Sequence, residues 1–143
     1  MTDETYNRVG SRLWLEHWDD DTRMVALYLL TCKHRPTEGI YHLPEAYAAT
    51  DLRWPSKRYA KAFKALLDDD FAEWDPDAEV VLIVNALKWQ SPANPNQMKG
   101  AVRKLLLLPS TTLTNRFAEQ VRKYSPALAK YIDENSPEVF TNE

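Results

Sequence analysis

A stripe of basic side chains on one expected helix offers the clearest chemistry in this sequence, and that chemistry is the capture of an anion. The helix is expected over residues 55–67 and begins at a proline. Lys and Arg side chains neutralise phosphate oxygens, and near the start of a helix they can reach base edges in the major groove of DNA. The candidate DNA-binding residues, mostly three or four apart, are Arg53, Ser56, Lys57, Arg58, Lys61 and Lys64.

The distribution of charge supports this interpretation better than the total does. The chain carries a net charge of −3, yet residues 51–64 hold five basic residues and one acidic residue. Lys57 and Arg58 lie at the positive end of the expected helix dipole, and residues 68–70 place three Asp at its negative end. Each such charge costs about 0.3–1 kcal/mol when exposed. A phosphate ligand would explain this arrangement, and a solvated basic face with a solvated acidic cap is the alternative.

A second basic group lies on a helix expected over residues 96–108. Lys99 and Arg103 are four residues apart and share a face, with Lys104 beside them. Lys99 and Arg103 are candidates for contact with flanking phosphates, although an ordinary amphipathic helix is the favoured interpretation.

Motifs of catalysis, metal binding and cofactor binding are missing. The three glycines are isolated, so no phosphate-cradling loop is present. Cys32 and His34 lack a second pair at zinc-binding spacing. We therefore expect no enzyme activity, no metal and no cofactor.

Composition points to one cytoplasmic domain. A chain of 143 residues with 44% apolar residues can bury a sizeable core. The single cysteine excludes an internal disulfide and fits a reducing compartment. The acidic start is unlike a secretory signal, and without an apolar run of about 18 residues no membrane partner is expected.

The elements that must position the basic stripe are delimited by prolines and acidic clusters. After a short strand near residues 8–14 and an acidic cap at residues 19–21, we expect a helix, a strand, a short helix, the basic helix and a hairpin, at 22–32, 39–42, 44–49, 55–67 and 71–84. This order is that of a winged helix-turn-helix, a mainly α (α+β) fold with a two- to three-stranded antiparallel wing sheet. An unrelated α+β domain with the same element order is the alternative.

Two parts of the chain are expected. Residues 1–95 would form the winged-helix DNA-binding domain, and residues 96–143 a C-terminal helical extension packed on the same domain. The extension would contain helices over residues 96–108, 112–124 and 126–135. The five tryptophans are expected in the core or half-buried, although Trp54 could instead touch DNA.

Three stretches, residues 27–32, 38–44 and 79–90, carry a resemblance to a known family. They read LYLLTC, EGIYHLP and EVVLIVNALKWQ. Together they resemble the N-terminal domain of phage replisome organisers, the DnaD-like and phage O-like replication initiation proteins, over residues 8–108. The resemblance implies a winged helix, origin DNA as ligand and recruitment of helicase-loading proteins. Longer members have a further C-terminal region that often meets the helicase loader, so that role is absent here or lies beyond Glu143.

The residues of the expected hairpin turn are unlike those of a wing that inserts into DNA. Residues 75–79 contain three acidic residues and no Lys or Arg. Because acidic groups repel phosphate, we expect that the wing tip stays out of the minor groove. Replacing Asp75 and Asp77 by Asn is therefore expected not to weaken DNA binding.

Two other functions fit the same fold. One is a transcriptional regulator, because fold alone does not fix function. The other is a protein–protein interaction module of the replisome, or a homodimer, that uses an apolar face of the C-terminal helices. That face could equally pack on its own chain; it consists of Phe117, Val121, Tyr124, Leu128, Tyr131 and Ile132.

Overall fold

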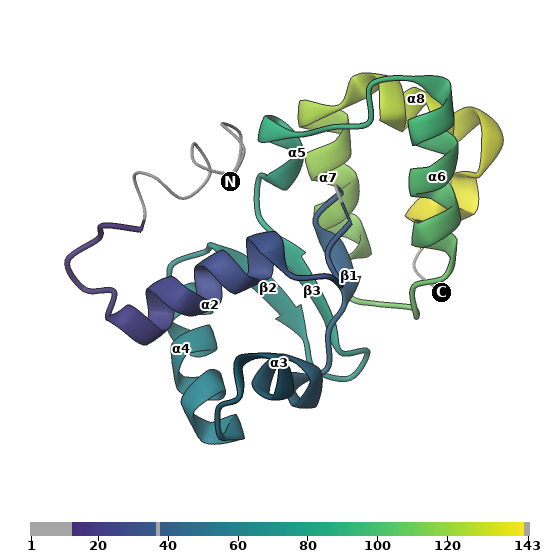
Figure 1. Cartoon of the computed structure of the whole chain (residues 1–143). Helices are drawn as coiled ribbons and strands as arrows, with labels where there is room; N and C mark the ends of the chain where they lie inside the picture. Colours follow the sequence, from purple (N-terminus) through teal and green to yellow (C-terminus); the bar gives the residue numbers. More distant parts are fainter. Residues whose placement is uncertain (1–12, 37, 142–143) are drawn as a thin grey trace.

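A computed structural model of the chain describes residues 13–36 and 38–141. In chain order, the structure begins with α2 (Asp20–Thr31), β1 (Ile40–His42), α3 (Glu45–Leu52), α4 (Ser56–Asp68), β2 (Ala72–Asp75) and β3 (Val80–Ile83). After β3 come α5 (Ala86–Trp89), α6 (Pro95–Leu106), α7 (Thr114–Tyr124), α8 (Pro126–Asn135) and the 3-10 helix η1 (Pro137–Phe140). The strands form one antiparallel sheet in the order β1-β3-β2 (Figure 1). The expected winged helix-turn-helix layout with additional C-terminal helices is confirmed.

The helix starts follow from capping residues and prolines. The Asp19 carboxylate accepts hydrogen bonds from the Thr22 backbone N–H at 2.8 Å and from its hydroxyl at 2.7 Å, which caps α2 as expected. Pro44 and Pro55 are the N-cap residues of α3 and α4. The sequence suggested instead that each proline would be the first residue of its helix. Their fixed φ leads the chain directly into α3 and α4.

Both faces of the sheet are covered, because successive side chains of a strand point to opposite faces. One face joins α2, α3 and α4 in a first cluster, to which the sheet contributes Tyr41, Val81 and Ile83. The other joins α6, α7 and α8 in a second cluster, with Ile40, Val80 and Leu82. All four residues of β3 are therefore buried, which explains its continuous apolar sequence.

The apolar face of the C-terminal helices packs on its own chain. Phe117, Val121, Leu128 and Ile132 are buried in the second cluster, and two tyrosines pack against it. This is the alternative that the sequence left open. The face therefore gives no support to self-association, and a homodimer stays a prediction.

Gly39 lies directly before β1, against Ala86 at the start of α5. Its φ is +79°, and a Cβ placed there would lie 2.4 Å from the Cβ of Ala86. Only glycine fits both the left-handed backbone and this close approach.

Several local expectations need correction. Of the strand expected near residues 8–14, residues 8–12 lie outside the described residues, and Leu13 and Trp14 are in a turn. Neither α5 nor η1 was expected. Trp14 and Trp89 are 71% and 37% exposed rather than buried, because both lie outside the two clusters.

No helix within residues 13–36 and 38–141 has both the length and the apolar character that crossing a bilayer requires. The position of the boundary at residue 95 stays a prediction. Leu87 already belongs to the second cluster.

Candidate nucleic-acid interface

The inner face of α4 is fixed by aromatic packing. Tyr59, Phe63 and Leu66 are buried as expected. The Tyr59 and Phe63 rings stack with centroids 5.4 Å apart, and Phe63 meets Trp74 of β2 edge to face at 5.5 Å. These contacts set the rotation of α4 about its axis, and so they determine which side chains face solvent.

The outer face of α4 carries the four expected cations, and all of them are exposed. They divide into two pairs. Lys57 and Lys61 make no ion pair with any described residue. Arg58 and Lys64 are each bound to a carboxylate, Lys64 to Asp68 one turn later at 2.9 Å. Two of the four expected cations therefore have no ion pair with the described residues.

Arg58 is held by the acidic start of α2. Its Nε and Nη2 donate to the two Asp21 oxygens at 2.9 and 2.8 Å, and its guanidinium lies 4.1 Å from the centre of the Trp54 ring. The hydrogen bond from Arg58 lowers the pKa of the Asp21 carboxyl, and the Lys61 charge adds to this effect. Any phosphate must compete with Asp21 for Arg58.

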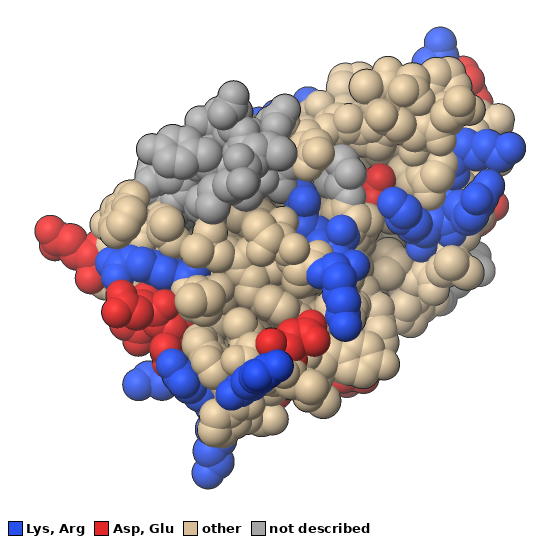
Figure 2. Space-filling view, in the orientation of Figure 1, with Lys and Arg blue, Asp and Glu red and all other residues tan. Residues whose placement is uncertain are grey.

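The pair of Arg58 and Asp21 was missed in the sequence, because 37 residues separate its members. The two oppositely charged helix starts lie together at one end of the molecule, where acidic and basic side chains are adjacent (Figure 2).

Arg53 and Ser56 flank the turn between α3 and α4. Arg53 closes α3 with φ +59° in the left-handed region, and Ser56 is the first residue of α4. Both are exposed, so the structure brings them together with Lys57 at the helix start. Trp54 is half-buried against the first cluster, which is the packing role favoured in the sequence.

The acidic run at the end of α4 is only partly the solvated cap that the sequence suggested: Asp68 and Asp70 are exposed, and Asp69 is half-buried. Asp69 accepts hydrogen bonds from the His17 and Trp18 side chains. Asp70 lies 3.6 Å from Arg116 of α7, which also contacts Glu73 of β2 at 3.6 Å. These acids join α4 and β2 to other segments, and those contacts explain charges that oppose the helix dipole.

Hydrogen bonds to Asp75 join the wing turn to the segment between α6 and α7. This side chain is only 3% exposed, and one of its oxygens accepts from the backbone N–H groups of Asp77 and Ala78. The other accepts from the Thr111 hydroxyl at 2.7 Å and the Thr112 N–H at 3.0 Å. The Thr111 hydrogen bond contributes most to lowering the pKa of Asp75, and the backbone donors add to it.

Asp75 is therefore a buried part of the wing turn and not an exposed acid at its tip. Its replacement would remove a buried hydrogen-bond acceptor, whereas Asp77 is exposed. That the wing tip stays out of the minor groove remains a prediction.

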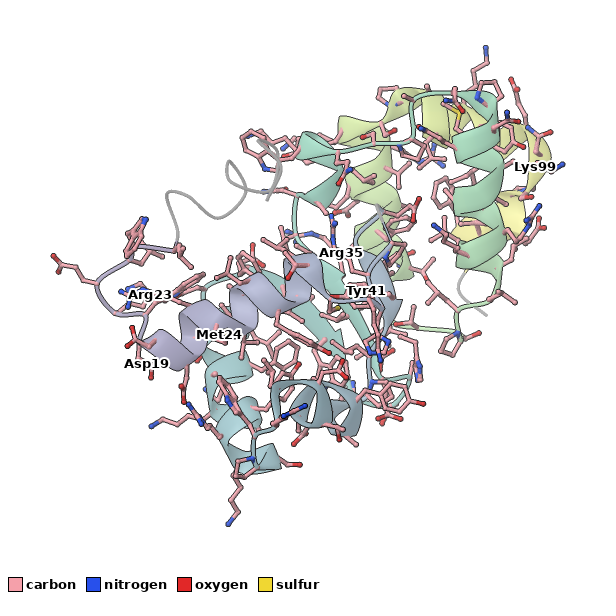
Figure 3. All side chains as sticks on the ribbon, in the orientation of Figure 1. Asp19, Arg23, Met24, Arg35, Tyr41 and Lys99 are labelled. Carbon is pink, nitrogen blue, oxygen red and sulfur yellow. The ribbon has the colours of Figure 1, made fainter. Side chains whose placement is uncertain are left out.

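The second basic group lies far from the first. Lys99 and Arg103 are exposed, and Val102 and Leu105 of the same helix are buried, so α6 is amphipathic as expected. The α6 helix belongs to the second cluster and α4 to the first, and Lys99 lies on the outer side of α6 (Figure 3). The structure does not bring Lys99 and Arg103 together with the α4 cations.

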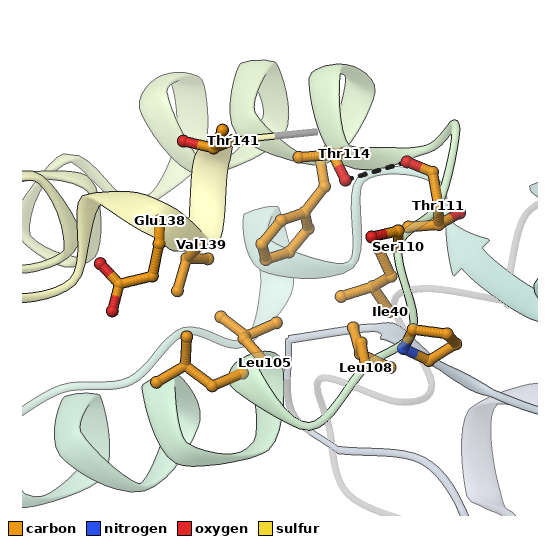
Figure 4. Close-up of a pocket in the computed structure, with 12 residues that line it drawn as sticks. Ile40, Leu105, Leu108, Ser110, Thr111, Thr114, Glu138, Val139 and Thr141 are labelled. Carbon is orange, nitrogen blue, oxygen red and sulfur yellow. Dashed lines mark hydrogen bonds between the residues drawn. The ribbon is translucent and has the colours of Figure 1, made fainter. Parts of the chain in front are cut away.

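A cavity of about 140 Å³ lies between α6, α7 and η1 (Figure 4). Its lining combines aliphatic side chains, among them Leu105, Leu108 and Val139, with hydroxyl groups, and the Thr114 hydroxyl donates to the Thr111 carbonyl at 3.0 Å. Across residues 13–36 and 38–141, no group of three or more His, Cys, Asp or Glu side chains is placed to hold a metal ion. The α4 surface is thus the strongest candidate for function.

Compared with known protein families, curated proteins and solved structures, the chain shows no match. The resemblance to phage replisome organisers stays a prediction.

Proposed function

We propose that this protein binds double-stranded DNA through the outer face of α4. In a helix-turn-helix, the second helix lies in the major groove, and α4 is the second helix here. The observation that carries the proposal is the pair of exposed, unpaired lysines, Lys57 and Lys61, on a helix whose inner face is fixed by aromatic packing.

The position of Lys57 strengthens the argument. It lies in the first turn of α4, which contains no acidic residue, where a cation is disfavoured by the helix dipole. No described carboxylate pairs with it, so the fold supplies no compensation. A phosphate group would be attracted both by this cation and by the free N–H groups of the helix start.

The remaining residues have supporting roles in this proposal. Arg53 and Ser56, beside Lys57, would contact backbone phosphates. Arg58 would join them only after leaving Asp21. From the resemblance to replisome organisers, we further propose that the DNA is a phage or prophage replication origin and that helicase-loading proteins are partners.

The test is a salt-series titration of duplex DNA, using a random duplex and a duplex from the region flanking the coding sequence. We expect the logarithm of affinity to fall with the logarithm of salt concentration with a slope of about −2 to −4, near 0.9 for each neutralised phosphate. Lys57→Glu with Lys61→Glu should weaken binding about a hundredfold, because two attractions become repulsions.

The matched control is Lys123→Glu with Lys130→Glu, which reverses two exposed lysines on α7 and α8. We expect this control to bind nearly as tightly as the natural chain. If the folded α4 double variant binds duplex DNA as well as the control does, α4 is not the interface.

A further inference from the structure

A polar hollow of about 390 Å³ lies between the segment before β1, the linker from α5 to α6, and α6 itself. Glu38, Gln90, Gln97, Gly100 and Lys104 are among the residues that line it. The volume is within the range of small-molecule sites. None of the residues proposed to contact DNA on α4 takes part in it.

Glu38 has one buried carboxylate oxygen without a hydrogen-bond partner. Its side chain belongs to a residue that is 3% exposed, and its Oε2 atom is buried without a hydrogen-bond donor. The nearby Arg35 also has buried, unpartnered Nε and Nη2 atoms, yet the described residues contain no ion pair between the two. Leaving a buried acceptor unsatisfied reduces stability, so Glu38 is better suited to a molecule that brings donors.

Gly100 is a second feature that the fold does not explain. It lies in the middle of α6, where glycine is less stable than alanine. A Cβ at this position would meet nothing within 4 Å, so no close packing requires glycine. Its missing side chain leaves the hollow open. Two features that reduce stability therefore meet at one site, as is typical of functional sites.

The other lining groups indicate the chemistry of the ligand. The Gln97 Oε1 accepts from the Ala93 N–H at 2.6 Å, which leaves the amide NH₂ as a donor. Lys104 is exposed, and basic side chains gather over α6 (Figure 2). The ligand should therefore present N–H donors to Glu38 and an anionic group to Lys104.

We propose that this hollow binds a guanine nucleotide, with the base donating to Glu38 and the phosphate close to Lys104. Guanine carries two adjacent donors, N1–H and the N2 amino group, so it can donate to a carboxylate without placing an acceptor against it. Adenine and cytosine place a ring-nitrogen acceptor beside their amino group, and thymine flanks its single N–H with two carbonyl oxygens. Each of these acceptors would repel the carboxylate.

The guanine can come from a free nucleotide or from an unpaired base of single-stranded DNA. Titrations followed by the backbone amide signal of Gly100 in NMR separate these sources. The probes are dGMP, dAMP, an oligothymidylate, and the same oligothymidylate with one central guanine. We expect dGMP to bind about tenfold more tightly than dAMP, which is the discrimination that one good base contact provides.

A free nucleotide as the source predicts that dGMP binds at least as tightly as the guanine-containing oligomer. An unpaired base as the source predicts that the oligomer with guanine binds more tightly than dGMP and than oligothymidylate. Equal binding of dGMP and dAMP would overturn the proposal.

Gly100→Leu tests the hollow itself, because the new side chain enters open space. We expect it to weaken dGMP binding at least tenfold. Ala127→Leu, at an exposed position of α8, is the matched control and should not change dGMP binding. Similar dGMP affinities for these two variants would refute the site.

Glu38→Gln removes the negative charge with little change in shape, and it should reduce the preference for dGMP over dAMP. If this variant does not fold, Gly100→Leu still decides the question. The variant with Lys57→Glu and Lys61→Glu should bind dGMP normally, so failure of the α4 interface and failure of the hollow are distinguishable.

Discussion

The helices α4 and α6 are both amphipathic and basic on their outer face, but they place their charges in opposite ways. Arg103 and Lys104 lie in the last turn of α6, where the helix dipole favours cations. Lys57 and Arg58 lie in the first turn of α4, where it disfavours them. Helix stability alone thus explains Arg103 and Lys104. On α4, Asp21 compensates Arg58, but no described carboxylate compensates Lys57. Our proposal of a ligand at α4 rests on this difference.

The largest expected effect is the contrast in DNA affinity between charge reversals on the two helices. Lys99→Glu with Arg103→Glu on α6 should weaken duplex binding less than about threefold, against about a hundredfold for Lys57→Glu with Lys61→Glu on α4. The salt dependence should decrease only for the α4 variant. Equal losses in fluorescence anisotropy titrations would show that DNA contacts both helices, and the comparison would fail.

The next effect concerns the wing turn, in which Asp75 accepts hydrogen bonds from the segment between α6 and α7. Asp75→Asn should lower the free energy of unfolding by about 1–3 kcal/mol at pH 7, because buried donors lose their charged acceptor. The folded variant should bind DNA normally, since we expect the wing tip to stay out of the minor groove. Asp77→Asn, at an exposed position in the same turn, is the control and should change neither quantity.

The pH dependence of unfolding sharpens this test. The pKa of Asp75 is lowered in the folded state, so its contribution to stability is present above the ordinary pKa of 3.8 and is lost as the pH falls through the lower folded value. The stability difference between the natural chain and Asp75→Asn in urea unfolding should therefore shrink between pH 5 and the acid limit. A difference that is constant over this range would contradict the assigned role of the carboxylate.

A smaller effect is expected at the contact between α2 and α4. Asp21→Asn removes the ion pair that holds Arg58, so duplex affinity should rise roughly three- to tenfold and the salt slope should steepen by about 0.9. Asp20→Asn is a matched control, because Asp20 pairs with Arg23 and not with Arg58. If both variants gain affinity equally, the gain reflects net charge, and Arg58 is not a latent DNA contact.

Local patterns predict much of this fold, and contacts between distant residues account for most of the corrections. Prolines and the acidic cap located α2, α3 and α4 to within a few residues. The four residues of α5 are too short to show helical periodicity. The contacts of Asp21 with Arg58 and of Asp75 with Thr111 span 37 and 36 residues. Because they depend on the packed arrangement of several elements, one sequence alone does not reveal them.

The smallest effect separates ligand from fold most directly. Lys57→Glu alone should raise the free energy of unfolding by about 0.3 kcal/mol, because it places an acid at the positive end of the α4 dipole. The same change should weaken DNA binding. Arg103→Glu on α6 should do the reverse, lowering stability by a similar amount with little effect on binding.

Lys57→Gln, which removes the charge without reversing it, should lie between the natural chain and Lys57→Glu in both stability and binding. Precise thermal unfolding at low salt can resolve these differences, since screening is then weakest. Suppose instead that Lys57→Glu destabilises α4. The lysine would then serve the fold, and its position against the dipole would no longer require a phosphate ligand. A gain in stability together with a loss of binding would mean that this residue is retained for what it contacts outside the chain.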